Sequence, residues 1–276
     1  MSGRIPTRPA ILLVVILAAL GAIAATAGTA GAELVYDNIP SPLPGNFASL
    51  GNEAYSTSEF GGEVELAGRA RNDLGVKVVM SSWACERGNW VDENCESGLP
   101  RMKGYFAVPV TFRIYEAGPG NTVGALRWTR TKSFKMDYRP SASPKCTGGE
   151  WYDEADAACY HGKAFVISLT GMRVRHLPAK VIISVSYNTT DHGPHPIGHA
   201  ACDETSEGCP YDSLNVGLSE PGEHTLSLGS DPTEDLFVNS TYPEMFCEGG
   251  VEGTFGPASC SAFWEGDQPL FAVTAK

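Results

Sequence analysis

Two closely spaced glutamates are the first residues in this chain whose types and spacing suggest chemistry. Glu63 and Glu65 alternate with Val64 and Leu66, so both carboxylates are expected on one face of a β-strand. Retaining glycosidases use such a pair of carboxylates, one as the nucleophile and one as the acid/base. The Glu-x-Asp-x-x-Glu stretch of jelly-roll glycosidases is matched only in part, because Gly68 occupies the third carboxylate position. We therefore expect a solvated outer face here and no catalytic residues.

Three histidines form a second candidate site. His192, His195 and His199 have a spacing that suits zinc or copper, with Asp191 and Asp203 nearby. The run is rich in glycine and proline, however, and it lacks the glutamate base of an H-E-x-x-H motif. We expect a surface loop and no bound metal.

Acidic clusters offer the oxygen donors that calcium prefers, although none has EF-hand spacing. They lie at residues 153–156, 203–204 and 234–235. We expect solvated loops at all three. The sequence also lacks a nucleophile elbow, a P-loop and a dinucleotide-binding motif, so we predict no enzyme activity and no cofactor.

Among the residue types that are rare in this chain, the tryptophans are the most informative. The chain has five, at Trp83, Trp90, Trp128, Trp151 and Trp264. Trp90, Trp151 and Trp264 lie in or beside stretches bracketed by cysteines, where flat rings can form platforms for sugars. Tryptophan is also used to complete a core or to pack against a disulfide, and we expect this role for most of them.

The cysteines indicate an oxidising compartment. Eight are present, and an even number in an exported chain predicts disulfides, whereas no C-x2-C or C-x4-C zinc spacing occurs. Eight cysteines allow 105 pairings. The simplest hypothesis joins sequence neighbours, so that each bridge closes one surface loop: Cys85–Cys95, Cys146–Cys159, Cys202–Cys209 and Cys247–Cys260.

The N-terminal segment predicts export. Residues 1–32 contain two arginines, an apolar run and an A-x-A-like site that ends at Ala32, which is the layout of a signal peptide. An uncleaved membrane anchor is the alternative. Removing Arg4 and Arg8 leaves 18 of the 20 basic residues against 32 acidic ones, so the net charge changes from -12 to -14. Such acidity argues against a nucleic-acid partner.

Alternation of apolar and polar residues predicts a single all-β domain over residues 33–276, a large jelly-roll-like β-sandwich. Strands are expected around residues 63–66, 76–80, 106–114, 134–138, 164–169, 181–187, 213–218 and 270–274. Pro109 predicts an edge or a bulge within its strand. Only residues 231–237 (DPTEDLF) suggest a helical turn, because of their acidic start.

Several stretches resemble a group of exported bacterial β-sandwich proteins of unassigned function, of a choice-of-anchor-like type. They are residues 35–40 (VYDNIP), 60–68 (FGGEVELAG) and 76–83 (VKVVMSSW), with a weaker match at 210–218. The resemblance implies an exported β-sandwich and supplies no catalytic residues. Some members of this type carry a wall-sorting or membrane tail, and this chain does not, so we expect release without membrane attachment.

These observations predict a secreted, non-catalytic extracellular β-sandwich protein that binds a glycan or a surface protein. The alternative is a secreted glycoside hydrolase on a jelly-roll frame, which would need two carboxylates about 5–10 Å apart in a groove.

Overall fold

The computed structural model describes residues 31–51, 57–88, 90, 92–187, 191–192, 195–196, 214–219, 226–233, 236–240, 254–258 and 266–276. These residues belong to one compact unit that runs from Gly31 to Lys276. Residues 1–30, which carry most of the predicted signal peptide, lie outside the described residues. Within the described ranges there is no helix, and so none that is long and apolar enough to cross a membrane.

The first sheet has seven antiparallel strands around β4. They are β1 (Glu33–Asp37), β2 (Ser49–Gly51), β4 (Leu74–Ser82), β9 (Lys163–Met172), β13 (Leu214–Ser219), β16 (Gln268–Pro269) and β17 (Phe271–Ala275). Strand β9 follows one side of β4 along its length. On the other side, β17 pairs with the first half of β4 and β13 pairs with the second half.

The second sheet has six antiparallel strands in the order β15-β14-β3-β10-β5-β6. They are β3 (Thr57–Glu65), β5 (Tyr105–Gly118), β6 (Thr122–Asp137), β10 (Lys180–Ser186), β14 (Leu236–Ser240) and β15 (Gly256–Pro257). Two short hairpins complete the strands of the described residues: β7 (Trp151–Asp153) with β8 (Ala158–Tyr160), and β11 (Asp191–His192) with β12 (His195–Pro196).

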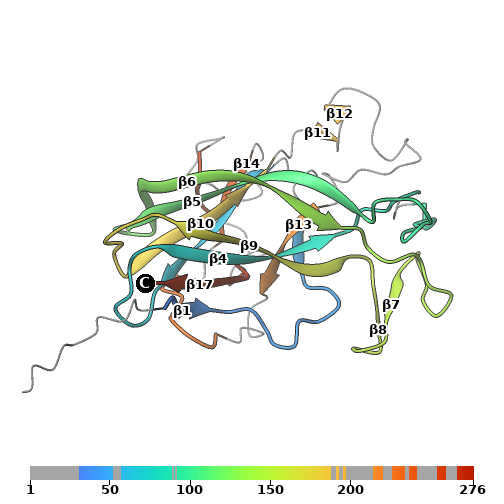
Figure 1. The fold of residues 1–276 in the computed structure, drawn as a ribbon, viewed down its shortest axis with the longest axis horizontal. Coiled ribbons are helices and arrows are strands. Elements are labelled where there is room, and N and C mark those ends of the chain that lie inside the picture. The colour runs from blue at the N-terminus through green and yellow to red at the C-terminus, as the bar shows by residue number, and fades with distance from the viewer. Residues whose placement is uncertain are drawn as a thin grey trace, which may run out of the picture. The chain divides into compact units, whose positions relative to one another are not determined.

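The two sheets pack face to face around one apolar core. Val78 of β4 and Met80 of the same strand are fully buried in a cluster that also contains Val64 of β3 and Ile183 of β10. Alternate residues of a strand point to opposite faces, so each strand contributes every second side chain to this core. Figure 1 shows the two layers, with β5, β6 and β10 in one and β4, β9 and β17 in the other. The predicted β-sandwich is therefore confirmed.

Most of the predicted strands are present, and several are longer than their alternation suggested. The alternating stretch at 106–114 lies inside the 14 residues of β5. Pro109 pairs with Ser133 of β6 but lies before Thr111, where pairing with β10 begins, so β5 is locally an edge at this proline. That position suits a residue without a backbone N–H, as predicted.

The predicted helical turn at residues 231–237 is wrong. Leu236 and Phe237 instead begin β14, where they pair with Gly62 and Gly61 of β3. Both side chains are fully buried. The apolar run that starts at Leu236 completes the second sheet, and this tertiary burial outweighs the local preference of the acidic residues before it.

Two of the four predicted disulfides lie in the described residues, and both are present. Cys85 bonds to Cys95 with a Cα–Cα distance of 5.4 Å, and Cys146 bonds to Cys159 with a Cα–Cα distance of 5.9 Å. Each joins cysteines that are close in sequence and so closes one loop, as the spacing suggested. Cys202, Cys209, Cys247 and Cys260 lie outside the described residues.

Candidate functional site

The outer face of the first sheet is covered by the segment that follows β1. Val79 of β4, Ala164 of β9 and Leu270 form a second apolar cluster on this face, separate from the main core. Ile39 and Phe47, from the covering segment, pack against this cluster. Strand β4 is therefore buried on both faces, which explains why Val78 and Val79 are adjacent and both apolar.

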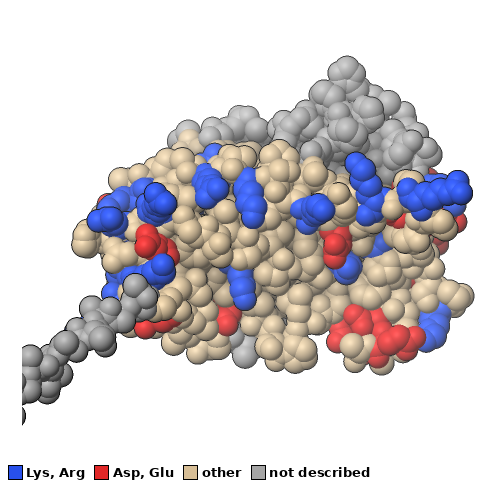
Figure 2. All heavy atoms as spheres, in the orientation of Figure 1, with Lys and Arg blue, Asp and Glu red and all other residues tan. Residues whose placement is uncertain are grey.

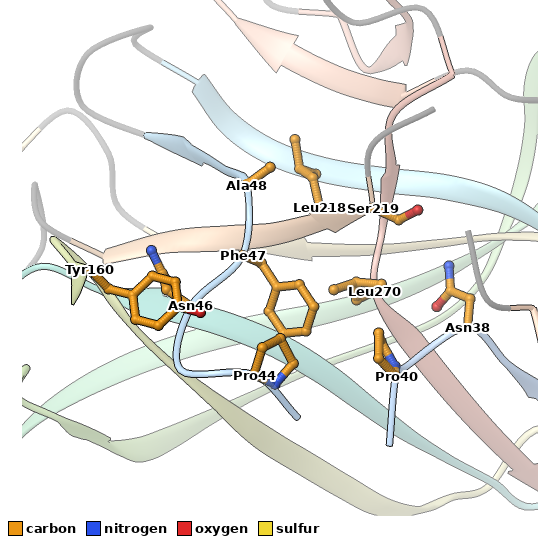
Figure 3. A pocket seen from close by; sticks show the side chains of 10 residues that line it. All are labelled: Asn38, Pro40, Pro44, Asn46, Phe47, Ala48, Tyr160, Leu218, Ser219 and Leu270. Atoms are coloured by element: carbon orange, nitrogen blue, oxygen red, sulfur yellow. The ribbon is translucent and has the colours of Figure 1, made fainter. Parts of the chain in front are cut away.

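A pocket of about 640 Å³ opens between this covering segment and the sheet. Figure 3 shows the Phe47 ring between Pro44 and Leu270, with Tyr160 and Asn46 toward one end and Asn38 toward the other. Its lining residues are Asn38, Pro40, Pro44, Asn46, Phe47, Ala48, Tyr160, Leu218, Ser219 and Leu270. The pocket thus combines two aromatic rings with apolar side chains, amides and two hydroxyl groups.

Asn38 holds the covering segment against the last strands. Its amide nitrogen donates to the carbonyl of Pro269 at 3.2 Å, and its amide oxygen accepts from the N–H of Phe271 at 2.6 Å. The side chain is almost completely buried. Both functional atoms are used within the fold, so Asn38 builds the wall of the pocket and offers little to a ligand.

Tyr160 is positioned by Asp156 from the same hairpin. The Tyr160 hydroxyl donates to Oδ2 of Asp156 at 2.9 Å, and the same oxygen accepts from the N–H of Gly45 at 2.6 Å. Burial, followed by the hydrogen bond to Asp156 and its negative charge, raises the pKa of Tyr160 to about 12. The phenol is therefore neutral at physiological pH and keeps its proton as a donor.

Gly45 allows the hairpin to approach the covering segment closely. A Cβ atom at this position would lie 2.5 Å from Oδ2 of Asp153 and 2.7 Å from the Tyr160 ring. A side chain there would force Asp153 or the Tyr160 ring to move. The glycine therefore sets the distance between Tyr160 and the rest of the pocket wall.

An aromatic cluster is connected to the pocket lining through the chain and through hydrogen bonds. The Trp83 ring stacks on His161 with centroids 5.4 Å apart, and Trp90 contacts Trp83 edge-on at 5.0 Å. Trp90 is 37% exposed, so one ring of the cluster is open to solvent. Since His161 directly follows Tyr160 in the chain, one short segment supplies a ring to the pocket and a ring to the cluster.

A chain of hydrogen bonds connects the cluster to the pocket. The indole N–H of Trp83 donates to the hydroxyl of Ser81 at 3.1 Å, and that hydroxyl donates to the amide oxygen of Asn46 at 2.7 Å. Asn46 is thereby oriented with its amide oxygen toward Ser81. Its NH₂ group is the end of the amide that remains for the pocket.

Both described disulfides support this region. Cys159 is the neighbour of Tyr160, and its bond to Cys146 closes the β7–β8 hairpin. Trp90 lies inside the loop closed by Cys85 and Cys95. The aromatic side chains beside the pocket are thus carried by loops whose freedom is limited covalently.

The predicted glutamate pair lies on the other sheet, away from the pocket lining. Glu63 and Glu65 do share the outer face of β3, as the alternation predicted. Glu63 is only 5% exposed, however, so its expected solvation is wrong. Oε2 of Glu65 accepts from the hydroxyl of Ser230 at 2.9 Å, and neither glutamate belongs to the lining of this pocket.

The same face of β3 carries a buried carboxylate that the sequence did not single out. Oε1 of Glu59 accepts hydrogen bonds from the hydroxyls of Tyr115 and Ser184, and its Oε2 lies 3.2 Å from Nη1 of Arg113. Burial, followed by the charge of Glu59, raises the pKa of Tyr115 above its ordinary value. Phe255 stacks on Tyr115 with centroids 5.4 Å apart. The carboxylate is satisfied by partners, which fits a structural role.

The metal hypotheses gain no support from the described residues. His192 and His195 pair across the β11–β12 hairpin, while His199 and Asp203 lie outside the described ranges. In the cluster at 153–156, Glu154 pairs with Lys145 and Asp156 binds Gly45 and Tyr160. Where the structure describes the chain, no three His, Cys, Asp or Glu residues gather as they would around a metal ion. The clusters at 203–204 and 234–235 lie outside those ranges.

Two of the tryptophans have the expected packing role. Trp151 is buried and donates from its indole to the carbonyl of Gly162 at 2.6 Å, and Trp128 packs against the main core. Trp90 keeps an open face, while Trp264 lies outside the described residues.

Sequence reasoning missed the pocket itself. Its most prominent signal is the stretch 39–47 (IPSPLPGNF), where three prolines alternate with Ile39, Ser41 and Leu43 shortly after a strand. Prolines with these neighbours favour an extended segment that can lie over a sheet.

Comparison of the chain with protein-family models, with curated proteins and with solved structures finds no match. Function is therefore inferred from the pocket and its neighbouring aromatic cluster.

Proposed function

We propose that this protein is an exported, non-catalytic binding protein whose pocket takes part of an extracellular glycan. The observation that carries the proposal is the pocket of about 640 Å³ whose lining includes the rings of Phe47 and Tyr160. Pockets of this size, with apolar walls and a few polar groups, are typical of small-ligand sites.

The chemistry of the lining suits a sugar. A pyranose ring has an apolar C–H face, which packs on aromatic rings, and hydroxyl groups, which bond to amides and phenols. Tyr160 and Phe47 supply the rings, and the NH₂ group of Asn46 supplies a donor. The open face of Trp90 would receive a further sugar unit outside the pocket.

Export is supported by the signal-like residues 1–32 and by the disulfides. Disulfides persist in oxidising compartments and are rare in the cytosol. Cys85–Cys95 and Cys146–Cys159 are both formed. An extracellular location also brings the pocket into contact with glycans of the cell surface or the medium.

Binding without catalysis is favoured by the carboxylates near the pocket. A glycosidase needs two carboxylates facing the scissile bond, about 5–10 Å apart. Among the described residues no Asp or Glu lines the pocket, and Asp156 behind Tyr160 already accepts two hydrogen bonds. A hydrolase on a jelly-roll frame is the alternative, and a surface-protein ligand is a further one.

A glycan array with the disulfide-bonded protein, followed by isothermal titration of the best oligosaccharide, tests this proposal. We expect Tyr160→Ala and Trp90→Ala each to weaken binding about tenfold or more, since rings at the centre of a contact dominate affinity. Tyr152→Ala and Leu126→Ala are the matched controls. Tyr152 lies on the same hairpin outside the lining, and Leu126 is an exposed apolar residue of β6.

Three outcomes would overturn the proposal. One is an array without a bound glycan, and another is binding that both aromatic variants leave unchanged. Release of reducing ends from the bound oligosaccharide would favour the hydrolase instead.

A further inference from the structure

Strand β6 has an unusual concentration of positive charge. It carries Arg127, Arg130, Lys132 and Lys135 within 16 residues, and all four side chains are exposed. The whole chain, by contrast, has a net charge of -12. Figure 2 shows Lys and Arg side chains in a row along the side of the molecule where β5 and β6 run.

Three of these four cations have no acidic partner among the described residues. Arg127 pairs with Glu116, whereas no ion pair is formed by Arg130, Lys132 or Lys135. The two lysines instead lie over aromatic rings. Lys132 is 4.8 Å from the centre of the Phe134 ring, and Lys135 is 4.3 Å from that of Tyr105. Such contacts hold the ammonium groups near the strand without neutralising them.

The strand also has a free edge where the structure describes its surroundings. Strand β6 pairs with β5 on one side, and no other described strand pairs with it. Alternation places Arg130 and Lys132 on the face of β6 that carries Phe134, whereas Lys135 lies on the opposite face with the exposed hydroxyl groups of Thr129, Thr131 and Ser133. At about 3.4 Å per residue, Arg130 and Lys135 are about 17 Å apart along the strand, so a ligand that contacts all three cations must be elongated and lie along the free edge.

We propose that β6 docks a linear anionic polysaccharide, whose sulfate or carboxylate groups pair with Arg130, Lys132 and Lys135. A second copy of the chain does not suit this edge, because two β6 strands in contact would bring like charges together. The acidic residues elsewhere are largely screened beyond a Debye length of about 8 Å at physiological ionic strength, so the local positive charge dominates at the strand. The surface shares no residue with the pocket.

Binding to immobilised dextran sulfate, with neutral dextran as the reference polymer, tests the proposal. We expect the wild-type protein to bind dextran sulfate, and to bind it less tightly as salt is raised. The variant R130Q/K132Q/K135Q should bind about tenfold more weakly, since each exposed ionic contact contributes modestly. The control R69Q/K77Q/K180Q removes the same charge from three exposed positions that form no ion pair with any described residue, and its binding should change little.

Equal loss in the two triple variants would assign the effect to net charge and overturn the proposal. Absence of binding at low salt, together with self-association of the R130Q/K132Q/K135Q variant, would also overturn the proposal. The cations would then only prevent the free edge of β6 from pairing with another strand. Equally tight binding of duplex DNA would also overturn it in favour of a nucleic-acid ligand. Tyr160→Ala should leave dextran sulfate binding intact, which separates this proposal from the pocket.

Discussion

The Glu59 carboxylate on β3 reaches across β10 to the guanidinium of Arg113 on β5, with Oε2 and Nη1 3.2 Å apart. The hydroxyl of Ser186 on the crossed strand accepts from the same Arg113 nitrogen at 2.6 Å. Three neighbouring strands are thereby connected on the outer face of the second sheet by side chains as well as by backbone hydrogen bonds.

Loss of the Glu59 carboxylate should destabilise the protein strongly. Glu59→Ala leaves Arg113 partly buried without its counter-charge and leaves the hydroxyls of Tyr115 and Ser184 without their acceptor. We expect the free energy of unfolding to fall by about 3 kcal/mol, as is typical when one partner of a buried pair is removed. Urea unfolding followed by tryptophan fluorescence measures the change.

Glu116→Ala is the control for this prediction, because Glu116 pairs with Arg127 at the surface of the same sheet. Exposed pairs contribute about 0–1 kcal/mol. An equal effect of the two substitutions would show that burial of Glu59 adds nothing to stability.

Asn38→Ala should also lower the free energy of unfolding substantially, although it removes only a small side chain. The substitution leaves the N–H of Phe271 and the carbonyl of Pro269 buried without their partner. We expect a loss of about 2 kcal/mol, the usual consequence of unsatisfied buried polar groups. Thermal unfolding measured by circular dichroism tests this, with Ser133→Ala at an exposed position of β6 as the comparison. Similar melting temperatures for the two variants would contradict the prediction.

Stability should decline in alkali above about pH 10. Burial is the largest cause of the raised pKa of Tyr36, Tyr115, Tyr138 and Tyr160, which is about 12 for Tyr160. An unfolded tyrosine releases its proton near pH 10, whereas these folded ones retain it, so the folded state binds more protons there. The stability that these tyrosines contribute is fully present below pH 10 and is lost as the pH rises through their pKa in the folded state.

Urea midpoints between pH 8 and pH 12 measure this dependence. Tyr160→Phe should make the decline shallower, because one of the shifted groups is removed. Tyr152→Phe is the control, since Tyr152 lies on the same hairpin outside the pocket lining. A slope that Tyr160→Phe leaves unchanged would contradict the role assigned to this phenol.

Removal of the Cys146–Cys159 bridge should affect both stability and the pocket. We expect C146S/C159S to lower the free energy of unfolding by about 3 kcal/mol, the value that loop-closure entropy gives for a loop of this length. Binding of the glycan proposed above should weaken as well, because Tyr160 follows Cys159 directly. C85S/C95S is the comparison, and it should affect contacts through Trp90 instead. Unchanged affinity for the glycan in C146S/C159S would show that the disulfide does not position the residues of the pocket.

The remaining cysteines give a prediction that mass spectrometry can test. Peptide mapping without reduction should find Cys202 bonded to Cys209 and Cys247 bonded to Cys260, beside the two bridges that are already described. The short sequence separation favours local pairing because small loops close with the least loss of entropy. A peptide that joins Cys202 to Cys260 would contradict this pairing.

The period-two alternation of residues such as Phe106 to Ile114 determined the fold class from the sequence alone. Strand formation with one buried face is a local property, so spacing along the chain is enough to reveal it. The same holds for Cys85–Cys95 and Cys146–Cys159, whose partners are close in sequence. The segment around Leu236 shows the limit, because its strand depends on pairing with β3, which is distant in the chain.

Only the tertiary structure decided where the candidate site lies. The pocket joins Asn38, Phe47, Tyr160 and Leu270, which no spacing rule connects. The burial of Glu59 with Arg113 likewise depends on the order β3-β10-β5. Strand order and register arise from many long-range contacts formed together, and alternation specifies only which face of each strand is apolar. The sequence therefore determined a disulfide-containing β-sandwich, and the packing of distant segments decided where its pocket and its positive edge lie.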